Sequence, residues 1–259
     1  MPKITKKRIK ELASLKQKKI RENKKLFIAE GEKIVSDLLE SKAEIVTIVA
    51  TKDWMLVNQN KLNSVIEFLE IGTNELSRLS FMTTPNKVIA YVKITEPHFD
   101  MKKLDNKLSL VLDDIQDPGN MGTIIRLSEW FGIENIVCSK NSADVYNPKV
   151  IQASMGAFLK VNLFYLDLEK FLNDFKKQSV LPVYGSFLDG KNIYTTTLRP
   201  TGIIIMGNES KGISKSIESF VDEKLTIPSF SLLQGRMNSL NVSVATAIIC
   251  SEFRRNTKV

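Results

Sequence analysis

The chain has 259 residues, 43% of them apolar, which is enough for one large domain or two of ordinary size with buried cores. No apolar run approaches the roughly 18 residues that a membrane-spanning helix needs. The two cysteines, Cys138 and Cys250, lie far apart within apolar runs, which excludes a metal-binding spacing and indicates small buried side chains. We therefore expect a cytoplasmic protein with no membrane contact and no metal ion.

The net charge of +8 is concentrated at the start of the chain. Residues 1–25 contain eleven Lys or Arg and two acidic residues, whereas the rest contains 26 basic and 27 acidic residues. Two interpretations of this basic N-terminal arm are open. It is either a solvated, partly helical segment or an arm that contacts the phosphates of RNA or DNA.

Residues 26–94 alternate between strand and helix patterns and predict a small α/β domain. Strands are expected at 26–29, 45–49, 65–71 and 88–94, and helices at 32–39 and 74–79. Residues 95–107 are polar and contain a proline, which is typical of a linker. The only histidine, His98, falls in this linker, so we expect a surface residue rather than a catalytic one.

Residues 108–259 predict a second α/β domain, which starts with the apolar run Leu108–Leu112, typical of a strand buried on both faces. A helix is expected at 121–131 with Asn120 as its N-cap, and a last helix at 240–253 with Ser239 as its N-cap. Strand and helix patterns alternate between them, at 135–138, 148–153, 163–166, 168–176, 181–186, 202–206, 215–220 and 224–227. This alternation predicts a parallel sheet covered on both faces.

The stretch from Gly202 to Ile249 predicts the ligand site, because strand-like runs there end in loops marked by glycine or proline. Residues 207–214 have glycines at P-loop spacing, but Ile213 stands where the lysine belongs, which excludes a P-loop. No G-x-G-x-x-G follows a strand, which excludes the dinucleotide-binding fingerprint. The glycines favour close approach of the backbone to a flat ligand.

Three segments together resemble the SpoU (TrmH-like) family of RNA ribose 2′-O-methyltransferases, part of the SPOUT superfamily. Residues 117–126, Asp-Pro-Gly-Asn-Met-Gly-Thr-Ile-Ile-Arg, are similar to the family's N-x-G-x-I-x-R segment. The others are residues 205–213, Ile-Met-Gly-Asn-Glu-Ser-Lys-Gly-Ile, and Ile227-Pro228 followed by Ser-Leu-Asn-Val-Ser-Val-Ala at 239–245. Residues 27–31 and 83–90 resemble the family's substrate-binding domain, so the resemblance covers nearly everything after residue 25.

The resemblance implies a deep trefoil knot near the C-terminus, S-adenosylmethionine as the cofactor, and a homodimer. It assigns catalysis to Arg126, with substrate positioning by Asn120, Glu209, Ser239 and Asn241. The cofactor contacts that it implies lie around Met206, Gly207, Asn208, Ile227, Pro228 and Leu240. In one place the chain departs from the family pattern, because Ser229–Gln234 separates Pro228 from the following glycine as a short insertion.

These residues favour an enzyme over the alternative, a non-catalytic RNA-binding or ribosome-assembly factor on the same fold. By analogy with the rRNA-directed members of the family, which the separate substrate domain resembles, ribosomal RNA is expected as the substrate over transfer RNA. An arginine, whose pKa lies above about 12, is a poor base. We therefore expect Arg126 also to stabilise the developing alkoxide electrostatically.

Overall fold

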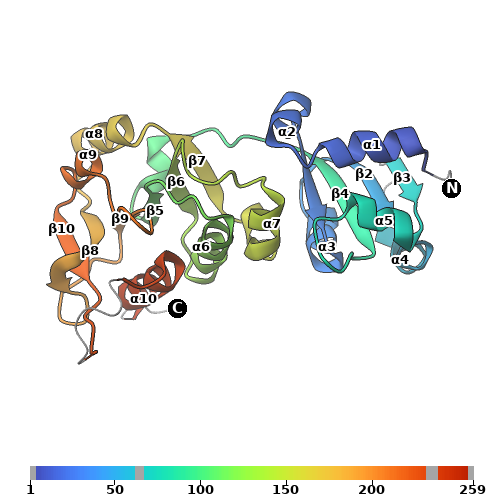
Figure 1. Ribbon diagram of the computed structural model, residues 1–259. Coiled ribbons are helices and arrows are strands. Elements are labelled where there is room, and N and C mark those ends of the chain that lie inside the picture. The colour runs from blue at the N-terminus through green and yellow to red at the C-terminus, as the bar shows by residue number, and fades with distance from the viewer. Residues whose placement is uncertain (1–3, 62–66, 232–238, 256–259) are drawn as a thin grey trace. The chain divides into compact units, whose positions relative to one another are not determined.

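The computed structural model describes residues 4–61, 67–231 and 239–255, and the chain folds into two compact units (Figure 1). The N-terminal unit comprises Met1–Glu96 together with Val145–Leu159. The C-terminal unit comprises Pro97–Asp144 together with Lys160–Val259. The sequence patterns gave no sign that a segment from the middle of the second predicted domain would pack with the first.

A four-stranded mixed sheet forms the centre of the N-terminal unit, in the order β1-β4-β2-β3. Strand β4 is antiparallel to both β1 and β2, and β3 is parallel to β2. The bounds are Leu26–Glu30 for β1, Ile45–Ala50 for β2, Glu67–Glu70 for β3 and Val88–Lys93 for β4. The four expected strands are therefore present, although 65 and 66 lie outside the described residues.

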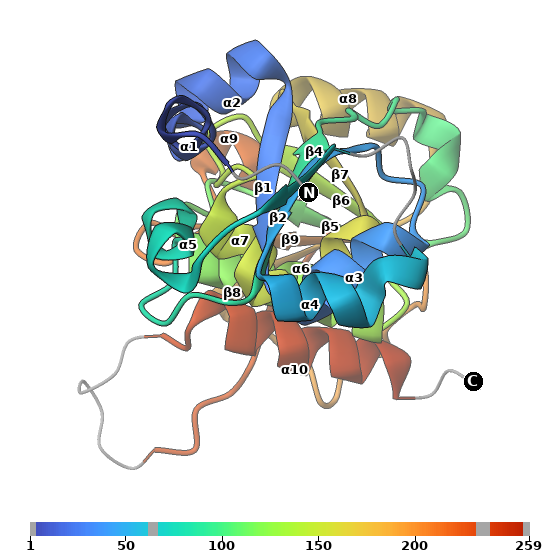
Figure 2. The same cartoon turned by 90° about the vertical axis from the view of Figure 1, so that its right-hand side faces the viewer.

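Helices cover both faces of this sheet. Figure 2 shows α1 and α5 on one side of it, and α3 and α4 on the other. The helical bounds in this unit are α1 Lys6–Ser14, α2 Lys18–Lys24, α3 Glu32–Glu40, α4 Lys52–Asn58, η1 Gln59–Lys61, α5 Thr73–Leu79, α7 Pro148–Ser154 and η3 Ala157–Leu159. Helix α4 was not predicted, because its buried residues Trp54 and Met55 are adjacent and show no helical period.

The basic segment at the start of the chain is part of this folded unit. Ile9, Leu12 and Leu15 are buried in one core with Leu76 and Leu79 of α5. Ile9 and Leu12 share one face of α1 and Leu15 follows at its C-cap, whereas the lysines of the helix are exposed. The segment is thus a solvated surface on one side and a part of the core on the other.

Six parallel strands form the sheet of the C-terminal unit, in the order β10-β8-β9-β5-β6-β7. Their bounds are β5 Leu108–Leu112, β6 Asn135–Ser139, β7 Asn162–Leu166, β8 Val183–Asn192, β9 Gly202–Met206 and β10 Glu223–Thr226. This confirms the predicted fold class, a parallel-sheet α/β domain with a smaller N-terminal α/β domain.

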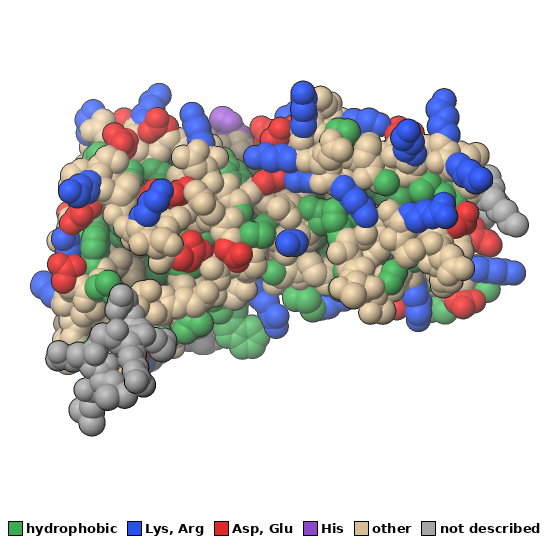
Figure 3. Space-filling view, in the orientation of Figure 1, with side chains coloured by type: hydrophobic (Ala, Val, Ile, Leu, Met, Phe, Trp, Pro, Cys, Tyr) green, Lys and Arg blue, Asp and Glu red, His purple; other side chains and the backbone are tan. Residues whose placement is uncertain are grey.

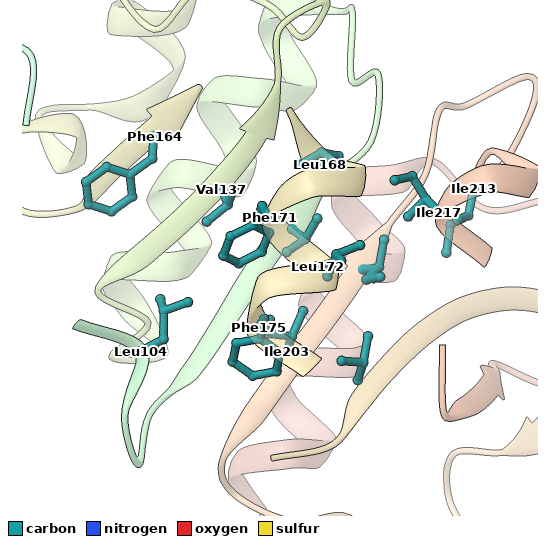
Figure 4. Packing of buried hydrophobic residues seen from close by; sticks show 13 residues of the cluster. Leu104, Val137, Phe164, Leu168, Phe171, Leu172, Phe175, Ile203, Ile213 and Ile217 are labelled. Atoms are coloured by element: carbon teal, nitrogen blue, oxygen red, sulfur yellow. The ribbon is translucent and has the colours of Figure 1, made fainter. Parts of the chain in front are cut away.

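Helices lie on both faces of the parallel sheet, with α8 and α9 on one face and α6 and α10 on the other (Figure 1). Figure 4 shows Phe171, Leu172 and Phe175 of α8 packing onto the strands in an apolar cluster of this unit. The bounds are η2 Met101–Leu104, α6 Pro118–Trp130, α8 Leu168–Gln178, α9 Lys215–Glu218 and α10 Val242–Arg254. Among the described helices, none is long and apolar enough to cross a membrane.

Both cysteines are small buried side chains of this unit, as their apolar surroundings in the sequence predict. Cys138 lies in β6 and Cys250 in α10, and both are fully buried. Burial raises the pKa of the Cys250 thiol to about 12, and burial also raises the pKa of Cys138. Neither thiol is ionised near neutral pH, so neither is suited to nucleophilic or metal chemistry.

Candidate functional site

The candidate site lies where the order of the parallel strands reverses. The chain passes from β5 to β6 on one side, whereas β9 pairs with β5 on the other side. Open parallel sheets bind ligands at such a point, beyond the carboxyl ends of the strands. The loop after β5 leads into α6, and the loop after β9 carries the glycines at 207 and 212.

Helix α6 begins at Pro118, and Asp117 is its N-cap. The Asp117 carboxylate accepts a hydrogen bond from the Asn120 backbone N–H at 2.8 Å. The prediction of Asn120 as the N-cap is therefore wrong. Proline is favoured at the first position of a helix because its ring presets the helical φ, so the helix starts three residues earlier than predicted. As a result the Asn120 side chain is free to face the glycine loop.

Asn120 connects three segments that are far apart in the sequence. Its side-chain amide donates to Glu209 Oε1 at 2.8 Å, and its Oδ1 accepts from Asn241 Nδ2 at 2.9 Å. Asn120 and Glu209 are half-buried, and Asn241 is exposed. The hydrogen bonds thus run in one direction, from α10 through α6 to a carboxylate, and they bring three of the five predicted catalytic residues together.

Asn241 is also the N-cap of α10. Its Oδ1 accepts from the backbone N–H of Ser243 at 3.0 Å and of Val244 at 3.3 Å, so both ends of its amide are used. The prediction of Ser239 as the N-cap is therefore wrong. Asparagine and serine cap helices about equally well, so the sequence could not decide between two such residues. Ser239 is exposed ahead of the helix.

The loop after β9 folds back on itself. Asn208 and Gly212 pair through two backbone hydrogen bonds of 3.0 and 2.9 Å. A Cβ on Gly207 would lie 2.3 Å from the backbone of Gly212 and Ile213, and Gly212 has φ +70°. Glycine at 207 is thus required by close approach of the loop's own backbone, whereas glycine at 212 is favoured by its left-handed conformation.

The Asn208 side chain holds this loop in place. Its Oδ1 accepts from the backbone N–H of Ser210 at 2.9 Å and of Lys211 at 3.1 Å. Its Nδ2 donates to the backbone carbonyl of Asp114 at 2.8 Å. Both ends of the side-chain amide are therefore used within the protein, and Asn208 serves to fix the shape of the glycine loop.

Two aspartates directly after β5 support the same loop, and sequence reasoning missed them. Asp113 is buried, and its Oδ2 accepts from the backbone N–H of Ser214 at 2.8 Å. Asp114 has φ +59° and receives the hydrogen bond from Asn208. The signal in the sequence was a pair of acidic residues directly after a fully apolar strand, where a buried carboxylate needs hydrogen-bond partners.

The residues assigned to the cofactor differ in what they expose. Met206 is buried, and its carbonyl accepts from the Asp113 N–H at 2.9 Å, so its side chain belongs to the core. Ile227 and Pro228 follow β10 and are half-buried. Leu240 leaves 44% of its surface exposed. The side chains of Ile227, Pro228 and Leu240 offer apolar surface at the carboxyl edge of the sheet, which suits a flat, partly apolar group.

Arg126 is exposed on α6, six residues after Asn120. Six residues turn an α-helix by about 600°, so the two side chains point in directions about 120° apart. Among the residues that the structure describes, Arg126 makes no ion pair or side-chain hydrogen bond. It is therefore not part of the chain of hydrogen bonds around Asn120 within one molecule.

Two further expectations concern metal ions and the insertion after Pro228. In the described ranges, the structure shows no group of three or more His, Cys, Asp or Glu placed to hold a metal ion. Of the insertion Ser229–Gln234, the structure describes Ser229 to Ser231, which are exposed, and residues 232–234 lie outside the described residues.

Comparisons with known proteins agree with this arrangement of site and fold. The model of the SpoU rRNA methylase family matches residues 107–251, which include every residue of the site described above. The chain belongs to this family. The model of an MRM3-like substrate-binding domain matches residues 6–90 of the same SpoU-family protein. The match starts at α1, which agrees with the packing of that helix in the core.

Similar proteins cover the SpoU-family chain almost from end to end. A 23S rRNA (guanosine(2553)-2′-O)-methyltransferase, RlmP of Bacillus subtilis, is 28% identical over 95% of this chain and 96% of its own. A structure from Porphyromonas gingivalis assigned to the TrmH family of RNA methyltransferases is 36% identical, with a TM-score of 0.88 over 99% of this chain and 100% of that one. A structure of an rRNA methyltransferase from Sinorhizobium meliloti with bound AdoMet has the same fold, with a TM-score of 0.86 at 24% identity, over 100% of this chain and 98% of that one.

These findings confirm the resemblance seen in the sequence and the prediction of an RNA 2′-O-methyltransferase. They favour the enzyme over the non-catalytic factor, and rRNA over tRNA, because the family model and the RlmP relative are both named for rRNA methylation. The individual roles of the site residues remain predictions.

Proposed function

We propose that this protein transfers a methyl group from S-adenosylmethionine to a ribose 2′-hydroxyl of structured rRNA. The observation that carries this proposal is the run of hydrogen bonds from Asn241 through Asn120 to Glu209, at the carboxyl edge of the parallel sheet. It leaves the second Glu209 oxygen and one Asn120 amide hydrogen available to orient a sugar hydroxyl. The RlmP relative, named as a 23S rRNA 2′-O-methyltransferase, supports ribosomal RNA as the substrate.

S-adenosylmethionine supplies an electrophilic methyl group on a sulfonium when it is bound. The exposed Leu240 and half-buried Ile227 and Pro228 would cover its apolar parts, and the backbone at Gly207 would hold its polar edge. The side chains of Met206 and Asn208 would act indirectly, because one is in the core and the other fixes the glycine loop. We also propose that these loops form a trefoil knot, as they do in the family.

Arg126 would act on the 2′-hydroxyl as it loses its proton. Methyl transfer needs the oxygen aligned with the methyl group and at least partly deprotonated, and positioning alone can supply several kcal/mol of such a barrier. The permanently charged guanidinium would stabilise the developing alkoxide. Ser239, exposed ahead of the N-terminus of α10, would contact a substrate phosphate there.

A homodimer would bring Arg126 to the site. Trp130 lies one turn after Arg126 on α6 and is 81% exposed, and Val244 on the neighbouring helix α10 is 48% exposed. Large exposed apolar side chains on adjacent helices mark a protein–protein contact. Since Arg126 points away from Asn120, it would complete the site of the partner subunit. The dimer would work in the cytoplasm, where the two buried thiols of each chain stay reduced.

Calorimetric titration with S-adenosylmethionine tests the cofactor assignment. We expect one binding site per chain, and we expect the variant Gly207→Ala to lose binding, because a methyl group at 207 displaces the glycine loop. A matched control is Gly132→Ala, where a Cβ meets nothing within 4 Å, although its φ of +64° adds some strain. A folded wild-type dimer that binds no S-adenosylmethionine would contradict the proposal.

A further inference from the structure

A surface loop of the N-terminal unit is fixed from below by one buried carboxylate. Glu30, at the end of β1, is 5% exposed. It accepts hydrogen bonds from Ser80 Oγ at 2.6 Å, from the Phe81 N–H at 2.9 Å and from the Asn86 N–H at 3.3 Å. These donors lie at both ends of residues 80–86, so the carboxylate holds the loop in one conformation. Its hydrogen-bonding capacity is largely used by the loop.

The loop presents two large apolar side chains and a lysine held beside them. Phe81 and Met82 each leave 37% of their surface exposed. The Lys16 ammonium lies 5.0 Å from the centre of the Phe81 ring and donates to the backbone carbonyl of Ser80 at 2.7 Å and of Arg78 at 3.3 Å. An ammonium has three hydrogens, so one remains for a further acceptor. Adjacent exposed apolar side chains in a fixed loop are suited to contact a ligand.

Phe81 and Met82 form part of the wall of a cavity of about 240 Å³ in the same unit. Ile28 and Glu30 line it from β1, and Pro148, Lys149, Gln152 and Ala153 line it from α7. Pockets for whole drug-sized ligands measure about 300 Å³ or more. The cavity is therefore suited to a smaller flat group, such as a single nucleobase.

Two polar side chains of α7 at this cavity are available to a ligand. Lys149 is exposed and Gln152 is half-buried one turn later. Within the described part of the chain, neither the Lys149 ammonium nor the Gln152 side-chain amide makes a hydrogen bond. An amide can donate and accept at once, as the edge of a base requires. The free charge at the cavity is basic, which matches the phosphates that flank a base.

We propose that this cavity binds one unpaired base of the RNA substrate. The base stacks on Phe81 beside Met82, the Gln152 amide reads its edge, and Lys149 and Lys16 contact the flanking phosphates. Sequence-specific proteins recognise unpaired RNA bases by this combination of an aromatic ring, a hydrogen-bonding side chain and positive charge. The proposal rests on the proposed function, since it takes RNA as the substrate. It adds a second point of recognition, in the N-terminal unit.

Fluorescence anisotropy tests this inference. It measures the affinity of the protein for short single-stranded oligoadenylate, for oligouridylate and for an RNA duplex of matched length. Phe81→Leu keeps an apolar side chain but removes the ring, and we expect it to weaken single-strand binding roughly 5- to 100-fold. Phe81→Tyr keeps the ring and should bind like the wild type. Gln152→Ala should reduce the difference in affinity between the two oligonucleotides. Val57→Ala, at an exposed apolar position of α4 in the same unit, is the matched control.

Equal binding by Phe81→Leu and the wild type would overturn the inference. An equal loss of single-strand and duplex binding in that variant would overturn it too, because a general charged surface does not distinguish the two. The assay contains no S-adenosylmethionine and measures no methylation. A protein that binds the oligonucleotides as expected but transfers no methyl group would therefore contradict the proposed function alone.

Discussion

Asn120 connects the two halves of the proposed site at the level of single residues. Its amide donates to Glu209 and accepts from Asn241, which itself caps α10. An intramolecular hydrogen bond contributes about 0.5–1.5 kcal/mol, and a half-buried group that loses its partner costs more. The side chain thus fixes the position of the Glu209 carboxylate relative to α6 and α10.

Replacing Asn120 with alanine should reduce both stability and activity. The change removes two hydrogen bonds, so we expect the free energy of unfolding to fall by about 1–3 kcal/mol. The turnover number should fall further than this loss of stability explains, because Glu209 loses its position. Denaturant unfolding and methylation kinetics measure the two effects. Asn74→Ala, at an exposed residue of α5, is the control, and equal kinetics in both variants would contradict the role of Asn120.

Arg126 carries the predicted chemistry, and its substitution separates chemistry from binding. Arg126→Ala should abolish methyl transfer while the affinity for S-adenosylmethionine stays within a few-fold of the wild type. Arg126→Lys keeps a positive charge, so part of the activity should return if the role is electrostatic. Single-turnover rates measure the loss of methyl transfer, and calorimetry measures the affinity for S-adenosylmethionine as the control. Near wild-type turnover by Arg126→Ala would exclude the residue from catalysis.

At the level of helices and strands, the sequence predicted the elements that have strong periodic patterns. The apolar runs at 108–112 and 202–206 are β5 and β9 with the predicted bounds, because a strand buried on both faces has only apolar positions. The starts of α6 and α10 were misassigned, because several residues near each start can act as a cap. The hydrogen bonds among Asn120, Glu209 and Asn241 could not be predicted from the sequence, since 121 residues separate Asn120 from Asn241.

The basic helices α1 and α2 combine exposed charge with residues of the core. Deleting residues 1–25 would remove Ile9, Leu12 and Leu15 from the core, so a loss of RNA binding would follow from unfolding alone. Figure 3 shows Lys and Arg side chains gathered over these helices on the visible face. The role of their charge is better tested by substitutions on the exposed face.

Substitution of the exposed Lys6, Lys7 and Lys10 with alanine should weaken RNA binding and flatten its dependence on salt. Each lysine that contacts a phosphate should lower the slope of log K against log salt by roughly 0.7–0.9. Lys42→Ala with Lys52→Ala, exposed in the same unit, is the control. An unchanged slope would indicate that the lysines of α1 serve only as a solvated face.

At the scale of the whole molecule, the proposed site is complete only when two copies of the chain come together. Trp130 is exposed on the same face of α6 as Arg126, so Trp130→Glu should place a charge in the proposed contact between protomers. We expect sedimentation to show a monomer that is folded and inactive. Circular dichroism checks that both units of this variant are folded, and the buried Trp54 reports by its fluorescence on the N-terminal unit alone. An active monomer would contradict the proposal that Arg126 acts on the partner subunit's site.

The central claim is methyl transfer from S-adenosylmethionine to a ribose 2′-hydroxyl of rRNA. The direct measurement is incubation of the protein with trideuteromethyl S-adenosylmethionine and rRNA from a strain that lacks the gene, followed by mass spectrometry of the nucleosides. We predict the heavy methyl group on the ribose of one nucleotide, and no label with Arg126→Ala. Label on a base, or no label with the folded wild-type dimer, would contradict the account.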